Sequence, residues 1–377
     1  MYMNLPPKFI GSDIYRRSRY SDKHPLAIPR VSAVIDLCRA LDWLDDAAYL
    51  DSRVATRDEL LTFHREDYID ALVRAEDGES LSLDERRRYN IGLNGNPIFS
   101  EIFSRPATAC GATLTAVELL SASDGVVYSP AGGTHHGRPG HASGFCYLND
   151  PVIGLLAFLE RGFDRLLYVD IDAHHCDGVQ DAFHGDPRIL AVSIHEARRW
   201  PNTGLAHDTA DGSALNLPVE PGFNDTEMTL LRDDVVLPVV EAFQPQVLFL
   251  QTGADALMED PLSKLDLSNN AIWDFVGALR GAVARTLVVG GGGYNPWSVA
   301  RCWSGIWAVL NDFPIPDALN EPAEAFLRSL SWHRSAGRAP PDHWFTTLRD
   351  PMRLGPVRQS TQDLATSAQL RISSAPW

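Results

Sequence analysis

The sequence predicts an α/β protein in which a central, mostly parallel sheet is flanked by helices. Short, continuous apolar runs recur through the middle of the chain, as expected of strands that are buried on both faces. The stretches between these runs contain residues that favour the first turn of a helix. Polar and glycine-rich segments follow the runs, which places them at the ends of the predicted strands.

Five apolar runs are expected to form strands. The turn-forming pair Asp124-Gly125 precedes the first of them. Helical stretches separate several of the runs, and this alternation is typical of a parallel sheet. The runs comprise residues 126–128, 166–169, 189–192, 247–250 and 286–289.

Several helices carry their own start signals. Capping-box patterns begin at Thr56 and at Ser82, each with a glutamate three residues later. Asp150 is followed by a proline, so we expect an acceptor at the N-cap and proline in the first turn, with Gly162 ending that helix. Asn295 is also followed by a proline and predicts the start of a Trp-rich helix.

The chain is expected to fold as one large domain. Of its 377 residues, 45% are hydrophobic and 22% are charged, which argues against a disordered protein. The motifs described below draw on residues from Arg30 to Tyr294, so no boundary divides the chain in half. We expect a catalytic domain over residues 1–313. Residues 314–377, rich in Pro, Ser, Arg and Trp, are expected to form an extension packed on it.

The acidic charge narrows the partners. With 49 acidic and 33 basic residues, the formal net charge is -16, which disfavours binding to nucleic acid. No apolar run is long enough for a membrane span, and the N-terminus has no secretory signal pattern. The five cysteines are scattered without a CxxC pair, which favours a reduced, cytoplasmic protein. A homo-oligomer is compatible with the sequence.

Chemically active side chains follow all five predicted strands. They are His135 and His136 after the first, Asp170, Asp172 and His174 after the second, Ser193 and His195 after the third, Asp255 after the fourth, and Tyr294 after the fifth. Ligands bind at the carboxyl ends of the strands in open α/β sheets. The sequence therefore predicts a functional site at this edge.

The segment Asp170–His174 suggests a metal site. If the strand continues through it, Asp170, Asp172 and His174 alternate onto one face. Asp172 and His174 could then bind a divalent metal, with Asp255 as the best third ligand. Two carboxylates and an imidazole suit zinc, and also Fe(II), Co(II) or Mn(II). Taken alone, the same pattern also fits groups that only cap or bridge strand ends.

The adjacent histidines suggest acid–base chemistry. One imidazole of His135 and His136 could accept a proton from a metal-bound water, and the other could help to protonate the leaving group. Asp170 and Asp177 are available to set their tautomers. Tyr294, after four glycines, could donate to a developing oxyanion. An exposed His-His loop is the alternative, and the glycines lack the Lys-Ser/Thr of a phosphate-binding P-loop.

These motifs together resemble the zinc-dependent histone deacetylases and their bacterial relatives, which include acetoin-utilisation proteins and acetylpolyamine amidohydrolases. The resemblance lies in the ordered segments GGTHHGRPGHASGFCYLND, LLYVDIDAHHCDGVQDAF, QTGAD and LVVGGGGYNPWSVARCW. It implies the arginase/deacetylase fold, which is a single α/β domain.

The resemblance also implies a role for each matching residue. Asp172, His174 and Asp255 would bind one Zn²⁺. His135 and His136 would be the acid–base pair, oriented by Asp170 and Asp177, and Tyr294 would polarise the carbonyl. The substrate tunnel would be lined by Gly144, Phe145, Trp200, Arg30 and Gly292. A structural K⁺ would be held by Asp170, Asp172, His174, Ser193 and Ile194.

The implied activity is hydrolysis of an acetyl or other acyl group from the ε-amine of lysine in a protein or peptide. The family's aspartate that grips the peptide backbone is absent, since Asn94 stands there, and Trp200 replaces a smaller aromatic residue. These departures leave open a deacetylase of small acylated amines such as acetylpolyamines. A dimanganese ureohydrolase and a non-catalytic binding protein are weaker alternatives.

Overall fold

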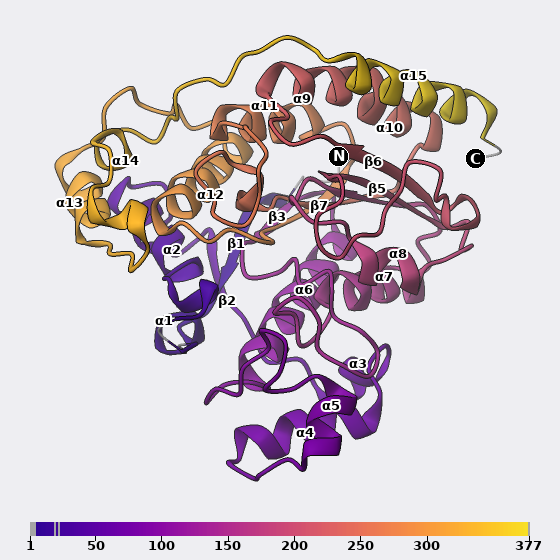
Figure 1. The fold of residues 1–377 in the computed structure, drawn as a ribbon, viewed down its shortest axis with the longest axis vertical. Helices are drawn as coiled ribbons and strands as arrows, with labels where there is room; N and C mark the ends of the chain where they lie inside the picture. Colours follow the sequence, from indigo (N-terminus) through magenta and orange to yellow (C-terminus); the bar gives the residue numbers. More distant parts are fainter. Residues whose placement is uncertain (1–4, 19, 22, 376–377) are drawn as a thin grey trace.

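The computed structural model describes residues 5–18, 20–21 and 23–375. Within them, eight parallel strands form one sheet in the order β2-β1-β3-β8-β7-β4-β5-β6 (Figure 1). The strands are β1 (Leu5–Gly11), β2 (Tyr49–Asp51), β3 (Gly125–Ser129), β4 (Leu166–Asp170), β5 (Ile189–Glu196), β6 (Ala214–Val219), β7 (Val247–Gln251) and β8 (Arg285–Val289). The predicted fold class is confirmed.

All five predicted strands are present, and the three that were missed lie toward the edges of the sheet. β1 contains two prolines, β2 has only three residues, and β6 contains Asn216 and Pro218. β2 and β6 are the edge strands, and pairing on one side only allows polar residues and proline in them. β1 is paired on both sides, but its two prolines fall in the irregular part of its pairing with β3, between Leu5 and Lys8. None of the three strands contains a long continuous apolar run.

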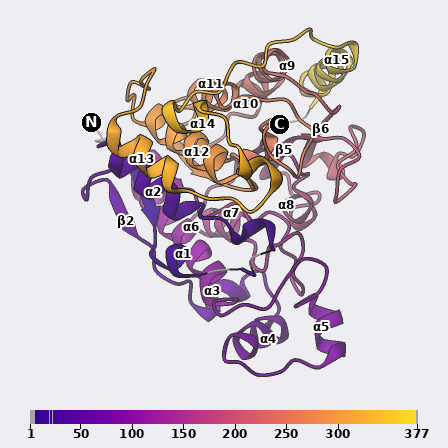
Figure 2. The same ribbon diagram turned by 60° about the vertical axis from the view of Figure 1, so that its left-hand side comes forward.

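Helices cover both faces of the sheet and complete a three-layer domain (Figures 1 and 2). Their bounds are α1 (Ile14–Arg17), α2 (Val31–Ala40), α3 (Arg57–Leu61), α4 (Glu66–Glu76), α5 (Leu83–Tyr89), α6 (Ser104–Ala122), α7 (Asp150–Glu160), α8 (Asp177–Ala182), α9 (Asp225–Leu231), α10 (Leu237–Phe243), α11 (Asn269–Leu279), α12 (Pro296–Leu310), α13 (Glu321–Ser329), α14 (His343–Thr346) and α15 (Gln359–Ser374). A π-helical stretch, Arg232–Val236, joins α9 to α10.

The strand residues alternate between two apolar clusters. Leu167 and Val169 of β4 belong to the cluster that packs under α2, α9, α10, α11 and α12. Leu166 and Tyr168 belong to the cluster on the opposite face, under α4, α6, α7 and α8. A strand buried on both faces has no polar position to interrupt it, which explains its continuous apolar sequence.

The helix starts agree with the predicted signals except at α7. Both capping boxes are present, at Thr56 and at Ser82, and Asn295 caps α12. The N-cap of α7 is Asn149, whose side chain accepts from the N–H of Val152, rather than the predicted Asp150. Asp150 is the first residue of the helix, and its carboxylate accepts from the N–H groups of Gly133 and Thr134.

The segment after Phe313 returns across the domain. α13 packs on α2, and α15 lies beside α9 and α10 (Figures 1 and 2). Arg358 forms hydrogen bonds of 2.6 and 2.8 Å with Glu227 of α9. Asp350 exchanges two hydrogen bonds with Asn269. The division at residue 313 stays a prediction.

No helix in the described part of the chain has the length and apolar character that crossing a membrane requires.

We expect the substitution Asp350→Ala to destabilise the domain strongly. Arg301 of α12 is completely buried, and its Nη2 lies 2.5 Å from the Asp350 carboxylate. Loss of one partner from a buried ion pair costs about 3–5 kcal/mol, because the other charge stays buried. Urea unfolding measures this change. Glu324→Ala removes an exposed partner of Arg328 and should cost less than about 1 kcal/mol. Equal losses of unfolding free energy in the two variants would contradict a strongly stabilising role for the buried Arg301–Asp350 pair.

Candidate metal-dependent active site

The predicted site residues meet at the carboxyl edge of four neighbouring strands. His135 and His136 follow β3, Tyr294 follows β8, Asp255 follows β7 and the Asp172–His174 segment follows β4. These strands are adjacent in the order β3-β8-β7-β4. Residues that are far apart in the sequence are therefore placed beside one another.

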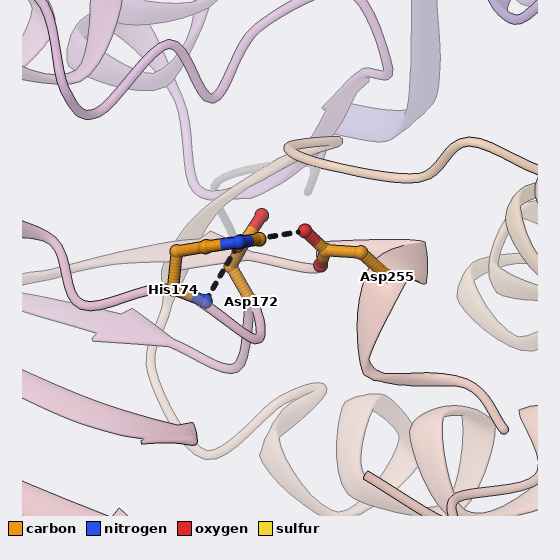
Figure 3. A group of neighbouring side chains, drawn as sticks. All are labelled: Asp172, His174 and Asp255. Atoms are coloured by element: carbon orange, nitrogen blue, oxygen red, sulfur yellow. Dashed lines mark hydrogen bonds and ion pairs between the residues drawn. The ribbon is translucent and has the colours of Figure 1, made fainter. Parts of the chain in front are cut away.

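Asp172, His174 and Asp255 form a buried group that could hold a metal ion (Figure 3). Their potential ligand atoms all lie within 4.8 Å of one another. Nδ1 of His174 is 2.9 Å from Oδ2 of Asp255 and 3.2 Å from Oδ1 of Asp172. The structure thus brings together the three residues expected to bind a metal.

The backbone that presents these residues differs from the expectation. β4 ends at Asp170, so strand alternation does not place Asp172 and His174 on one face. The chain bends instead, and the bend is held by side-chain acceptors. Oδ1 of Asp170 accepts from the N–H of Asp172, and Oδ1 of Asp172 accepts from the N–H of His174, each at 2.9 Å.

The charges of this group favour a bound cation. Burial and the charge of Asp172 raise the pKa of Asp255. Burial lowers the pKa of His174, but hydrogen bonds with Asp172 and Asp255 outweigh it and raise the pKa to about 10. Two buried carboxylates repel each other, and a divalent ion relieves that repulsion. Carboxylate oxygens and an imidazole nitrogen are ligands that suit Zn²⁺.

His135 and His136 lie side by side, with ring centroids 3.9 Å apart, and both are buried. Nδ1 of His135 is 2.7 Å from Oδ2 of Asp170, and Nδ1 of His136 is 2.6 Å from Oδ1 of Asp177. Arg138 also pairs with Asp177. In each imidazole, Nδ1 is therefore paired with a carboxylate, and Nε2 is the second ring nitrogen.

The two imidazoles have opposite proton affinities. Burial lowers the pKa of His135, but the charges of Asp170 and Asp172 outweigh it and raise the pKa to about 9. For His136, burial and the neighbouring His135 lower the pKa to about 3. At neutral pH, one ring carries a proton to give and the other can take one.

Aromatic and glycine residues surround this group. Phe145 lies with its ring centroid 6.0 Å from that of Tyr294. Trp200 lies 4.6 Å from His136 by the same measure and is 44% exposed, which places it at the surface end of the site. A side chain on Gly144 would clash with Trp200, and one on Gly292 would clash with Asp255.

A cavity of about 80 Å³ lies at the site. Arg30 lies along it, donates to the carbonyl oxygen of Gly291, and stacks 4.9 Å from the ring of Trp303. Of the predicted site residues, the cavity is lined by Arg30, His135, His136, Gly144, Phe145, Asp172, His174, Gly292 and Tyr294. Trp200 does not line the cavity, but its ring lies against that of His136.

Of the five residues expected to hold K⁺, Asp172 and His174 belong to the metal-binding group, and the other three lie in β4 and β5. Asp170 and Ser193 are register partners across β4 and β5, and Ile194 follows Ser193. Asp170 also accepts from the hydroxyl of Tyr168 at 2.6 Å, while Ser193 pairs with His195 at 2.9 Å. The K⁺ site stays a prediction.

Two acidic residues that sequence reasoning missed support the site. Asp150 accepts from the N–H groups of Gly133 and Thr134, which fixes the loop before the histidines. Asp260 accepts from the N–H of Tyr294 at 2.6 Å. The Asp150-Pro151 pair predicts only a helix cap, and Asp260 carries no signal beyond its proximity to Asp255 in the sequence.

Known proteins share this architecture. A model of the histone deacetylase domain matches residues 24–310. The chain is 31% identical over 362 residues to the acetoin utilization protein AcuC of Bacillus subtilis (strain 168), covering 92% of this chain and 91% of the relative. It is 34% identical over 318 residues to histone deacetylase 8 of Xenopus tropicalis, covering 82% and 85%.

The fold is also similar to that of a solved HDAC homologue from Aquifex aeolicus. The TM-score is 0.91 at 37% sequence identity, and the match covers 97% of this chain and 100% of that chain. The family resemblance read from the motifs is thereby confirmed. This chain belongs to the histone deacetylase family and is a hydrolase of the deacetylase type.

Proposed function

We propose that this protein removes an acetyl or other acyl group from the ε-amine of lysine in a protein or peptide. The observation that carries the proposal is the convergence, at one cavity, of a metal-binding group, two histidines of opposite proton affinity, and a tyrosine. Membership of the histone deacetylase family supports the deacetylase chemistry. The lysine side chain as carrier of the acyl group is the part that we propose.

Asp172, His174 and Asp255 would hold the Zn²⁺ on which this family depends. When bound, zinc supplies Lewis-acid polarisation and lowers the pKa of a coordinated water. Two carboxylates and one imidazole leave room for ligands other than protein, as catalytic zinc sites require.

The two histidines would transfer the protons of the reaction. His136 is neutral at neutral pH, so its Nε2 can take the proton of the attacking water, while Asp177 holds Nδ1. His135 is protonated, and it can give its proton to the amine as the C–N bond breaks. The water oxygen goes to the carbonyl carbon, and the products are a carboxylate and a free amine.

Tyr294 would donate its hydroxyl hydrogen to the oxygen that becomes negative. Burial raises the pKa of Tyr294 well above its ordinary value, so the hydroxyl keeps its hydrogen at neutral pH. A donor that is fixed before the reaction needs little reorganisation in the transition state. Phe145 and Trp200 would enclose the acyl-lysine chain and limit access of water.

A small acylated amine is the second candidate substrate, and Asn94 favours it. The side chain of Asn94 donates to Oδ1 of Asn90 at 2.9 Å. An amide carries no charge and offers one acceptor oxygen where a carboxylate offers two, so a peptide backbone would be held less firmly. The metal-binding group has three members among the described residues, fewer than a dimanganese ureohydrolase would need.

Turnover of a fluorogenic acetyl-lysine peptide should depend on zinc and on Tyr294. Dialysis against a chelator should abolish it, and one equivalent of zinc per chain should restore it. Tyr294→Phe should lower kcat about 100- to 1,000-fold, because one oxyanion donor is lost, with zinc content unchanged. Full activity of the metal-free protein would exclude the proposed chemistry.

The pH dependence of kcat/KM should report His135. Its proton is present below a pKa of about 9, so the rate should fall as pH rises through that value. Asp170→Asn removes a charge that raises this pKa, so the alkaline limb should move down by about one unit or more. Asp177→Asn, the matched substitution at His136, should move the alkaline limb less, because the charge of Asp177 is a smaller cause of the raised pKa of His135. A limb that Asp170→Asn does not move would contradict the assignment of the acid.

An acetyl-lysine peptide should be a better substrate than N-acetylputrescine when kcat/KM is compared. Asn94→Asp should raise kcat/KM for the peptide about tenfold or less, the scale of one charge-assisted hydrogen bond, and leave N-acetylputrescine unaffected. A preference for N-acetylputrescine in the unmodified protein would transfer the proposal to small amines.

A further inference from the structure

Tyr294 stands at the end of a backbone segment that has little intrinsic stiffness. Residues 290–293 are all glycine, and φ is +130° at Gly291 and +138° at Gly293. Glycine has no side chain to restrict its backbone or to pack against a neighbour. Contacts from outside the loop must therefore fix the position of Tyr294.

Hydrogen bonds anchor this loop at Gly290, Gly291, Gly292 and Tyr294. The carbonyl oxygens of Gly290 and Gly291 accept from the N–H of Thr252, at 2.9 Å, and from Arg30. At Gly292, the N–H donates to Oδ2 of Asp172 at 2.6 Å and the carbonyl oxygen accepts from Ala254 at 2.8 Å. At Tyr294, the N–H donates to Oδ2 of Asp260 at 2.6 Å. The contact at Gly292 involves Asp172 of the metal-binding group, whereas the contact of Tyr294 with Asp260 does not.

The surroundings of Asp260 hold its carboxylate in place for this contact. It is 5% exposed, and its second oxygen, Oδ1, accepts from the N–H of Leu262 at 2.9 Å. Its own N–H donates to the carbonyl oxygen of Leu257 at 3.0 Å, and Ser263 donates to the carbonyl oxygen of Asp255. Both carboxylate oxygens are thus used within a tightly closed turn.

The same turn carries Asp255, five residues before Asp260. One short segment therefore presents a residue of the metal-binding group and also holds the main chain of Tyr294. We propose that Asp260 is a positioning residue, which fixes the tyrosine hydroxyl relative to the Asp172–His174–Asp255 group. This inference rests on the role proposed for Tyr294, and it assigns no contact between Asp260 and substrate.

Removal of the carboxylate should release the tyrosine without unfolding the site. In Asp260→Ala, the N–H groups of Tyr294 and Leu262 lose their acceptor, while the Gly292 anchor remains. A displacement of about 1 Å at a reacting group costs about 100-fold in rate. We expect kcat to fall about 10- to 100-fold, with KM and zinc content little changed.

A double-mutant cycle with Tyr294→Phe separates positioning from general support. If Asp260 acts through the tyrosine hydroxyl, Asp260→Ala should change kcat by less than about threefold once that hydroxyl is absent. Multiplicative effects of the two substitutions would overturn the proposal. Unaltered turnover in Tyr294→Phe alone would instead refute the proposed function, so the two failures are distinguishable.

Two further variants control the experiment. Glu259→Gln changes the adjacent carboxylate, which faces Ser298 and His343 at 3.2 Å each, and should leave kcat unchanged. Asp260→Asn keeps one acceptor oxygen and should recover part of the activity. If Asp260→Ala does not fold, Asp260→Asn carries the same cycle, with the same near-absence of effect expected beside Tyr294→Phe.

Discussion

The site depends on two carboxylates, Asp172 and Asp255, that are buried together at the edge of the sheet. Such groups lose hydration and repel each other, so the surrounding chain must supply compensating donors. His174 lies between them, and the N–H groups of Ala173 and Gly292 each donate to one of them. The bend after β4 and the glycine loop after β8 are the backbone paths that bring these donors within reach. A larger residue in place of Gly292 would occupy the space of Asp255.

The histidine pair shows how environment separates chemically identical groups. Each imidazole meets one aspartate at nearly the same distance. His135 also lies near Asp172, whereas His136 lies between His135 and Trp200, and this difference drives their pKa values apart. The two imidazoles of one dipeptide therefore differ in proton affinity, because the strand ends place different charges on either side of it.

The sequence predicted the fold class, five strands and the residues that gather at the site, because buried parallel strands and site motifs leave strong local patterns. It did not predict β1, β2 or β6. β2 and β6 are edge strands, and the prolines of β1 fall in the irregular part of its pairing with β3, so none of the three has a long continuous apolar run. The residues after Asp170 predict a continuing strand rather than the observed bend, because alternating polar and apolar residues are compatible with both. Asp260 escaped detection because its partner is a main-chain N–H, and such contacts depend on tertiary structure rather than on residue type.

The return of the C-terminal segment has a consequence for biosynthesis. Asp350 supplies the carboxylate for Arg301, which is completely buried in a helix that packs on the central sheet. A ribosome that has released the chain only through α12 has delivered every residue of the site but not this partner. Until Asp350 is made, the only carboxylate paired with this guanidinium among the described residues is the more distant one of Glu259, at 4.0 Å, so stable closure of the core must await the segment that carries Asp350. The order of synthesis thus separates completion of the site residues from completion of the fold.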